Sequence, residues 1–239
     1  MTQHRERGQV TFTTARPTRL LLAAVVMKDE DFIQLAADHR VFAIVRAQSA
    51  QSALRAAEAA IVGGIKLIEV ALSTPGGFRV ISDLRRRYGD RATIGAGSVM
   101  NYDQIDRAIK CSAQFISMPH TNMQLVELCR KRRIPSIIGA LTPTEVGAAL
   151  AIGAPLVSLF PAGTLGGPEY LNALTSRIPD VKLVASGGVG SENIVDYFTA
   201  GAFAIAVGSR LFTLGDLQHE YYTAIAERAR GIIRLAGVA

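Results

Sequence analysis

The feature that most constrains the fold is a regular alternation of short β-branched runs with longer amphipathic stretches, which begins at Val41. The short runs have the composition of buried strands and start about 20 to 25 residues apart, which is the length of one strand–helix unit with short loops. Eight strands are expected, at residues 41–46, 66–72, 92–95, 114–118, 136–139, 156–160, 182–186 and 203–207.

Helical patterns fill the intervals, for example at residues 50–62, 102–110 and 122–132. Eight parallel strands, each followed by a helix, close into a single α/β TIM (β/α)8 barrel. An extra N-terminal helix over 29–40 is expected to cover the bottom of the barrel, and 217–235 reads as one closing helix. An open doubly wound sheet is the alternative, but Gly95-Ala96-Gly97 does not complete the dinucleotide-binding fingerprint.

Composition fits one such domain over residues 28–239, because 49% of the 239 residues are hydrophobic and only 19% are charged. The formal charge of +6 suits a small anionic substrate, and no basic run is interleaved with aromatics as in nucleic-acid-binding proteins. Cys111, Cys129 and the four scattered histidines form no metal or disulfide framework, so a cytoplasmic protein is expected.

Residues 1–27 are set apart by composition and are expected to be a disordered tail or the product of an overcalled start, with Met27 as the true one. Their apolar run, 20–26, is too short to cross a bilayer and lacks a convincing cleavage site. A targeting extension is the rival interpretation. No membrane partner is expected.

The active site of a TIM barrel lies at the C-terminal ends of the strands. Glu69 shares one face of its strand with Leu67 and Ala71, which places the carboxylate inside the barrel near this end. Burial would raise the pKa of Glu69 toward the range useful for general acid–base catalysis. Arg46 ends the first strand and could clamp a substrate carboxylate. The alternative for both residues is a structural ion pair between them.

Glycine-rich turns follow the seventh and eighth strands, where backbone N–H groups of a barrel commonly approach a phosphate. Similar turns also occur without a ligand, but two of them fall in the expected loops here. Ser98 and Pro119 follow the third and fourth strands and are expected to form part of the wall, whereas a lone loop histidine, His120, carries little weight. The turns are Ser186-Gly187-Gly188 and Gly208-Ser209.

Four segments, in order along the chain, carry a resemblance to a known family, and the match runs from about residue 41 to 212. They resemble the 2-keto-3-deoxy-6-phosphogluconate / 4-hydroxy-2-oxoglutarate aldolases. The resemblance implies a homotrimeric TIM barrel that needs no cofactor and cleaves a 2-keto-4-hydroxy acid to pyruvate and an aldehyde. The segments are Ile68-Glu69-Val70, Gly95-Ala96-Gly97-Ser98, Leu159-Phe160-Pro161-Ala162 and Ser186-Gly187-Gly188-Val189.

In that family a lysine on the sixth strand forms a Schiff base with the substrate ketone, and a glutamate on the second strand moves protons. The resemblance places the glutamate at Glu69 and the lysine at Ser158, whose hydroxyl cannot form an imine. None of the five lysines of the chain is well placed to substitute. The resemblance further implies substrate contacts by Arg46, Ser98, Pro119, Phe160 and Ser186, and phosphate contacts by Gly187, Gly188, Gly208 and Ser209.

Three functions stay open at this stage. The first is a lyase of a 2-keto acid, with or without a phosphate group, which is impaired without the imine or uses a divalent metal held by Glu69 and the substrate. Decarboxylation of a 2-keto diacid would be the neighbouring reaction. The second is a non-catalytic homologue that binds a keto acid or phosphate, and the third is an unrelated phosphate-handling barrel enzyme. Retention of Glu69 and Arg46 favours the lyase.

Overall fold

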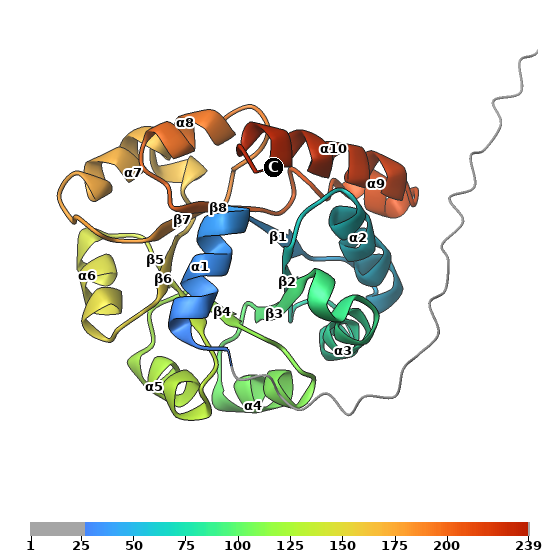
Figure 1. Ribbon diagram of the computed structural model, residues 1–239, viewed down its shortest axis with the longest axis horizontal. Coiled ribbons are helices and arrows are strands. Elements are labelled where there is room, and N and C mark those ends of the chain that lie inside the picture. The colour runs from blue at the N-terminus through green and yellow to red at the C-terminus, as the bar shows by residue number, and fades with distance from the viewer. Residues whose placement is uncertain (1–26, 239) are drawn as a thin grey trace, which may run out of the picture.

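The computed structural model describes residues 27–238 and has eight parallel strands in a closed barrel, in the order of the chain (Figure 1). The barrel closes where β8 pairs with β1, with Val41 opposite Ile205. Each expected strand overlaps an observed one, so the predicted TIM barrel is confirmed. The strands are β1 Val41–Val45, β2 Leu67–Ala71, β3 Thr93–Gly97, β4 Ile116–Met118, β5 Ser136–Ala140, β6 Leu156–Leu159, β7 Leu183–Ser186 and β8 Ala204–Val207.

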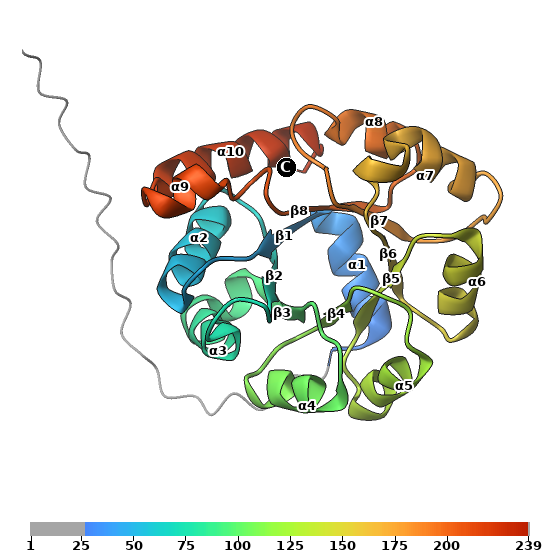
Figure 2. The same ribbon diagram turned by 180° about the vertical axis from the view of Figure 1, so that it is seen from behind.

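Helices surround the barrel on the outside (Figures 1 and 2). Several begin at a side chain that accepts a hydrogen bond from the first helical turn, such as Ser49, Asn101 and Asn122. Thr142 and Glu145 form a reciprocal capping box. The helices are α2 Ala50–Val62, α3 Gly77–Tyr88, α4 Tyr102–Lys110, α5 Met123–Arg132, α6 Pro143–Ala151, α7 Gly167–Thr175, α8 Ile194–Thr199, α9 Leu214–Gln218 and α10 Tyr222–Leu235, with short 3₁₀ turns at Gly89–Arg91 and Gly163–Leu165.

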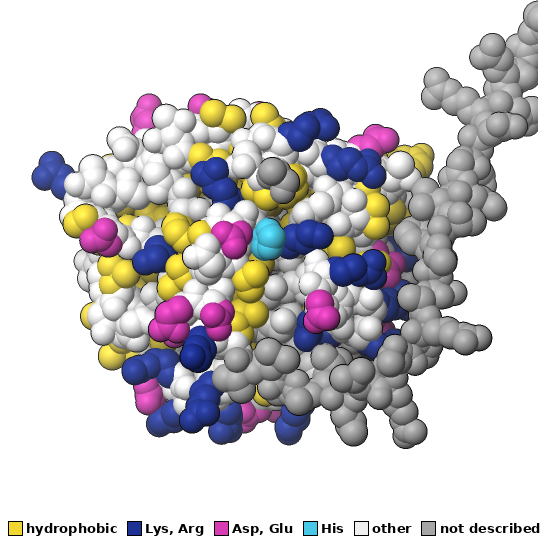
Figure 3. Space-filling view, viewed as in Figure 1, with side chains coloured by type: hydrophobic (Ala, Val, Ile, Leu, Met, Phe, Trp, Pro, Cys, Tyr) yellow, Lys and Arg dark blue, Asp and Glu magenta, His cyan; other side chains and the backbone are white. Residues whose placement is uncertain are grey.

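The expected extra helix, α1 Asp29–His39, crosses the end of the barrel where the strands begin (Figures 1 and 2). Phe32 from this helix packs against Phe42 and Phe115, with ring centroids 6.2 and 5.1 Å away, and all three rings are fully buried. A Cβ on Gly95 would overlap the Phe115 ring, so this position requires glycine. In the space-filling view of this face, side chains cover the end of the barrel (Figure 3). A functional pocket is therefore expected at the opposite end of the barrel, where the strands finish.

The prediction of one closing helix over 217–235 was wrong. The chain forms α9 and α10 instead, and Glu220 between them adopts a left-handed conformation with φ of 57°. Local hydrogen bonds explain the break: the Tyr221 backbone N–H donates to the Asp216 carbonyl at 2.8 Å across the left-handed Glu220, which ends α9. Arg228 from α10 then pairs with Asp216 at 2.9 Å, which fixes the two helices to each other.

The expected N-terminal extension lies outside the described residues except for Met27, which packs against the apolar cluster at the base of the barrel. Within residues 27–238, no helix has the length and apolar character that crossing a membrane requires.

Candidate active site

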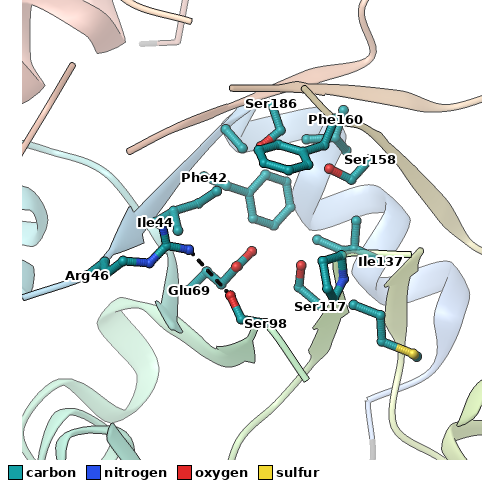
Figure 4. A pocket seen from close by; sticks show the side chains of 14 residues that line it. Phe42, Ile44, Arg46, Glu69, Ser98, Ser117, Ile137, Ser158, Phe160 and Ser186 are labelled. Atoms are coloured by element: carbon teal, nitrogen blue, oxygen red, sulfur yellow. Dashed lines mark hydrogen bonds between the residues drawn. The ribbon is translucent and has the colours of Figure 1, made fainter. Parts of the chain in front are cut away.

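A pocket of about 130 Å³ lies at the C-terminal ends of the strands (Figure 4). Seven of the residues predicted for the site line it: Arg46, Glu69, Ser98, Pro119, Ser158, Phe160 and Ser186. The four residues predicted to bind phosphate, Gly187, Gly188, Gly208 and Ser209, do not line it and follow β7 and β8. The remaining lining residues are Phe42, Ile44, Ser117, Met118, Ile137, Val184 and Ala206.

Glu69 on β2 is the carboxylate of this pocket, and only 5% of the residue is exposed. Burial raises the pKa of Glu69 from 4.5 to about 7, while a hydrogen bond from Ser117 and the charge of Arg46 act in the opposite direction. A Cβ on Gly97 would overlap the Glu69 carboxylate, so the glycine on the next strand makes room for it. The geometry therefore provides a carboxyl group that can both give and take a proton near neutral pH.

Arg46 follows β1 and holds its guanidinium beside Glu69 at the rim of the pocket (Figure 4). Its Nε donates to the Ser73 hydroxyl at 3.1 Å, and one terminal nitrogen lies 3.5 Å from the Ser98 hydroxyl. The predicted alternative, an Arg46–Glu69 ion pair, is not among the ion pairs within 4.0 Å that the described chain forms. The exposed guanidinium can still accept a carboxylate partner.

Ser98 has a left-handed backbone, with φ of 56°, which is uncommon for a residue other than glycine. It directly follows Gly97, and this conformation brings its hydroxyl to the guanidinium of Arg46. Such strain is often found at functional sites.

The opposite wall of the pocket is built by β6 and β7. It carries Ser158, Phe160 and Ser186, whose side chains face those of Glu69, Ser98 and Ser117 across the pocket (Figure 4). Ser186 is only 4% exposed, whereas Phe160 stands at the mouth with 47% exposed. The Phe160 ring lies against the backbone of Gly187. The site thus has an acid–base wall and a hydroxyl-bearing wall.

The glycine turns after β7 and β8 use their carbonyl groups internally. The Asn193 amide donates to the Gly188 carbonyl at 2.9 Å, and the Gly208 carbonyl accepts from the backbone of Leu211. Gly187 and Gly188 have φ of 84° and 82°, which glycine adopts readily. The backbone N–H groups of Gly188, Gly208 and Ser209 donate none of the hydrogen bonds made by turns and loops of the described chain. They are available for an anion.

A resident divalent metal does not fit the donors present. Among residues 27–238, no group of three or more His, Cys, Asp or Glu side chains could hold a metal ion. Glu69 is the single carboxylate among the residues that line the pocket.

A closed barrel with an acid–base pocket at the open end is the architecture of a TIM-barrel enzyme. The family model "Aldolase: KDPG and KHG aldolase" matches residues 33–228, which confirms the resemblance seen in the sequence. The chain belongs to this family.

Curated relatives and solved structures agree with this assignment. The chain is 31% identical over 176 residues to the 2-dehydro-3-deoxy-6-phosphogalactonate aldolase of Escherichia coli (strain K12), covering 73% of this chain and 85% of the relative. It is 28% identical to the 2-dehydro-3-deoxy-phosphogluconate aldolase of Treponema pallidum, covering 83% and 94%. Its fold matches that of a Legionella pneumophila KDPG aldolase, captured with pyruvate as a covalent carbinolamine intermediate, with a TM-score of 0.78 and 26% identity over 86% and 98% of the two chains.

Ser158 occupies the position that the resemblance assigns to the Schiff-base lysine, and no lysine is among the residues that line the pocket. Lys66 and Lys182 come immediately before β2 and β7, at the end of the barrel away from the pocket. The other lysines are Lys28 before α1, Lys110 at the end of α4 and Lys131 in α5.

Ser117 is the polar pocket residue that sequence reasoning missed. It lies on β4, is 8% exposed, and its side chain hydrogen-bonds Glu69. The sequence could have indicated this position, because alternation along the strand puts Ser117 on the same inward face as the buried Phe115. The alternation that located Glu69 could have located it too.

Proposed function

We propose that the chain is a lyase of a 2-keto acid that lacks imine chemistry, with Glu69 as the acid–base group and Arg46 as the anchor of the substrate carboxylate. The observation that supports this proposal is that Glu69 is buried in the pocket and has a pKa of about 7. Arg46 lines the same pocket and has no carboxylate partner within 4.0 Å in the described chain. A catalytic group works best when its pKa lies near the operating pH.

On this proposal, cleavage begins when the Glu69 carboxylate takes the proton of the substrate 4-hydroxyl. The C3–C4 bond breaks and the aldehyde leaves, while the electron pair forms a C2–C3 double bond and the C2 carbonyl pair moves onto its oxygen. The resulting enolate then takes a proton at C3 to give pyruvate. Because Ser158 cannot supply an imine, the negative charge stays on oxygen, and we expect slower cleavage than with a lysine at this position.

The free backbone N–H groups of Gly188, Gly208 and Ser209 support a phosphate on the distal end of the substrate. Relatives named as aldolases of phosphorylated sugar acids support the same substrate class. The homotrimer implied by the resemblance stays a prediction, which light scattering coupled to gel filtration would measure.

A keto-acid-binding protein without turnover is the second candidate, and the observation that favours it is Ser158 itself. Metal-assisted decarboxylation of a 2-keto diacid is the third. The single carboxylate in the pocket argues against a resident metal, which leaves only an ion chelated chiefly by the substrate.

The deciding experiment measures pyruvate release from 2-keto-3-deoxy-6-phosphogluconate and 4-hydroxy-2-oxoglutarate, with and without Mg²⁺ or Mn²⁺. Wild type is compared with Ser158→Lys and Glu69→Gln, and Ser176→Lys at the exposed end of α7 controls for added charge. We expect slow metal-independent release by wild type, faster release by Ser158→Lys, and loss of release in Glu69→Gln.

The outcomes separate the three candidates. Silence of the wild type with turnover by Ser158→Lys would support the binding protein. Metal-dependent release of pyruvate from oxaloacetate, run as a further substrate, without release from the two hydroxy keto acids would support the decarboxylase. Release by Glu69→Gln at the wild-type rate would refute the role of the glutamate.

A further inference from the structure

Two serine hydroxyls in the pocket have no hydrogen-bond partner in the part of the chain that the structure describes. Neither the Ser158 nor the Ser186 side chain takes part in any side-chain hydrogen bond formed within residues 27–238. Both line the pocket, and neither hydroxyl is among the sealed, unsatisfied polar atoms of the described chain. Both hydroxyls are therefore open to the pocket, and each has a proton that it can donate to a ligand atom bound there.

The two hydroxyls come from neighbouring strands and lie at adjacent inward levels of the barrel. Ser158 on β6 is opposite Val184 on β7, and Ser186 is two residues further along the same inward face. With strands about 4.8 Å apart and about 3.3 Å between residues, the two Cα atoms lie roughly 8 Å apart. Two hydroxyls at this spacing can approach one acceptor from two sides.

The placement of the charged groups indicates which atom that acceptor is. Arg46, Ser98 and Glu69 occupy the wall formed by the first strands, so a bound 2-keto acid directs its carboxylate to that wall (Figure 4). The hydroxyls of Ser158 and Ser186 lie across the pocket on the other wall, beside the Phe160 ring at the mouth (Figure 4). The keto group, next to the carboxylate in the substrate, is then the polar group between the walls.

We propose that the Ser158 and Ser186 hydroxyls form an oxyanion site that donates two hydrogen bonds to the C2 oxygen of a 2-keto acid. This inference rests on the proposed function and adds the groups that stabilise the negative charge on the C2 oxygen. When the C3–C4 or C3–H bond breaks, its pair forms the C2–C3 double bond, and the carbonyl pair moves onto the C2 oxygen. The serine protons stay on serine and stabilise that negative charge, since hydrogen bonds to an oxyanion are stronger than those to a neutral carbonyl.

The test uses exchange of the C3 protons of pyruvate for deuterium, followed by ¹H NMR, because exchange needs the enolate but not bond cleavage. Ser158→Ala and Ser186→Ala are compared with Ser176→Ala, an exposed serine whose hydroxyl bonds only the backbone of its own helix. We expect each pocket variant to lose about 10²-fold in exchange rate, by analogy with the loss of one donor from an oxyanion hole. Ser158→Thr, which keeps the hydroxyl, should retain most of the rate.

A second measurement separates stabilisation of the enolate from a structural effect. Oxalate carries a fixed negative oxygen where the pyruvate enolate carries one, so its dissociation constant should rise in step with the loss of exchange. The dissociation constant of pyruvate itself should change much less, because its keto oxygen is neutral. Equal weakening of both ligands would indicate a general disturbance of the pocket and overturn the proposal.

The failure of this inference differs from failure of the proposed function. If wild type neither binds pyruvate nor exchanges its protons, the lyase proposal itself is wrong. If wild type exchanges protons in a Glu69-dependent manner while both alanine variants keep the wild-type rate and oxalate affinity, only the oxyanion site is wrong.

Discussion

The buried carboxyl group of Glu69 should make the stability of the barrel fall as the pH rises. The folded state holds this proton more tightly than the unfolded state, because burial raises the pKa from 4.5 to about 7. At a pH below the pKa of Glu69 in the unfolded chain, the carboxyl is protonated in both the folded and the unfolded state, and it does not lower the free energy of unfolding. The cost grows between pH 4.5 and 7, where the unfolded chain ionises first, and is complete above pH 7. At 1.36 kcal/mol for each factor of ten in the acid constant, it amounts to about 3 kcal/mol.

Glu69→Gln removes the charge and keeps the shape, so it should remove this cost. For a domain of this size, each kcal/mol shifts the melting temperature by about 2–4 °C. We therefore expect Glu69→Gln to melt roughly 6–12 °C above wild type at pH 8.5. The two proteins should differ by less than about 4 °C at pH 5, where the folded-state carboxyl remains protonated.

Differential scanning calorimetry of both proteins from pH 5 to 8.5 measures this difference directly. Glu127→Gln, at an exposed glutamate of α5, serves as the control, and its effect should be small over the same range. A difference between Glu69→Gln and wild type that does not change with pH would refute the reasoning, as would a variant less stable than wild type at pH 8.5.

Three further predictions address the same pocket. Ser117→Ala removes a hydrogen bond that lowers the pKa of Glu69, so the midpoint of the pH–rate profile for pyruvate exchange should move upward. Gly97→Ala should cost about 1–3 kcal/mol in thermal or urea unfolding and abolish exchange, because its Cβ overlaps the Glu69 carboxylate, while Gly147→Ala in the open face of α6 should be tolerated. In a chain carrying Ser158→Lys, the stabilisation by Glu69→Gln at pH 8.5 should shrink or reverse, which a four-variant calorimetric cycle would measure.

The barrel and the position of Glu69 could be predicted from the sequence because both depend on local periodicity. A strand alternates its side chains between two faces, so Leu67, Glu69 and Ala71 had to share one face. Eight repeats of a strand and a helix have few ways to bury their apolar faces, and a closed parallel barrel is one of them. The site then followed from the rule that strand ends carry function.

Other features depend on contacts between segments that the sequence does not relate. The need for glycine at position 97 comes from the volume of the Glu69 side chain on the neighbouring strand. The break between α9 and α10 comes from the left-handed Glu220, from the backbone hydrogen bond of Tyr221 to Asp216 and from the Asp216–Arg228 ion pair, which the continuous helical pattern does not reveal. The guanidinium of Arg46 bonds the hydroxyls of Ser73 and Ser98, which follow two other strands, and the sequence does not show that these residues meet.

The serine at position 158 and the high pKa of Glu69 are connected, because a serine adds no positive charge to the pocket. A lysine ammonium in this pocket would stabilise the carboxylate and lower its pKa, whereas a serine leaves the desolvation of Glu69 opposed chiefly by Ser117 and by Arg46. The glutamate thereby becomes a proton donor and acceptor at neutral pH, while the group that would have drawn electrons from the substrate is absent. On our proposal the C2 oxygen must take that charge, so proton exchange and C–C cleavage depend on the same hydroxyl donors. The two rates should then fall together when Ser158 or Ser186 loses its hydroxyl, because both reactions pass through one enolate.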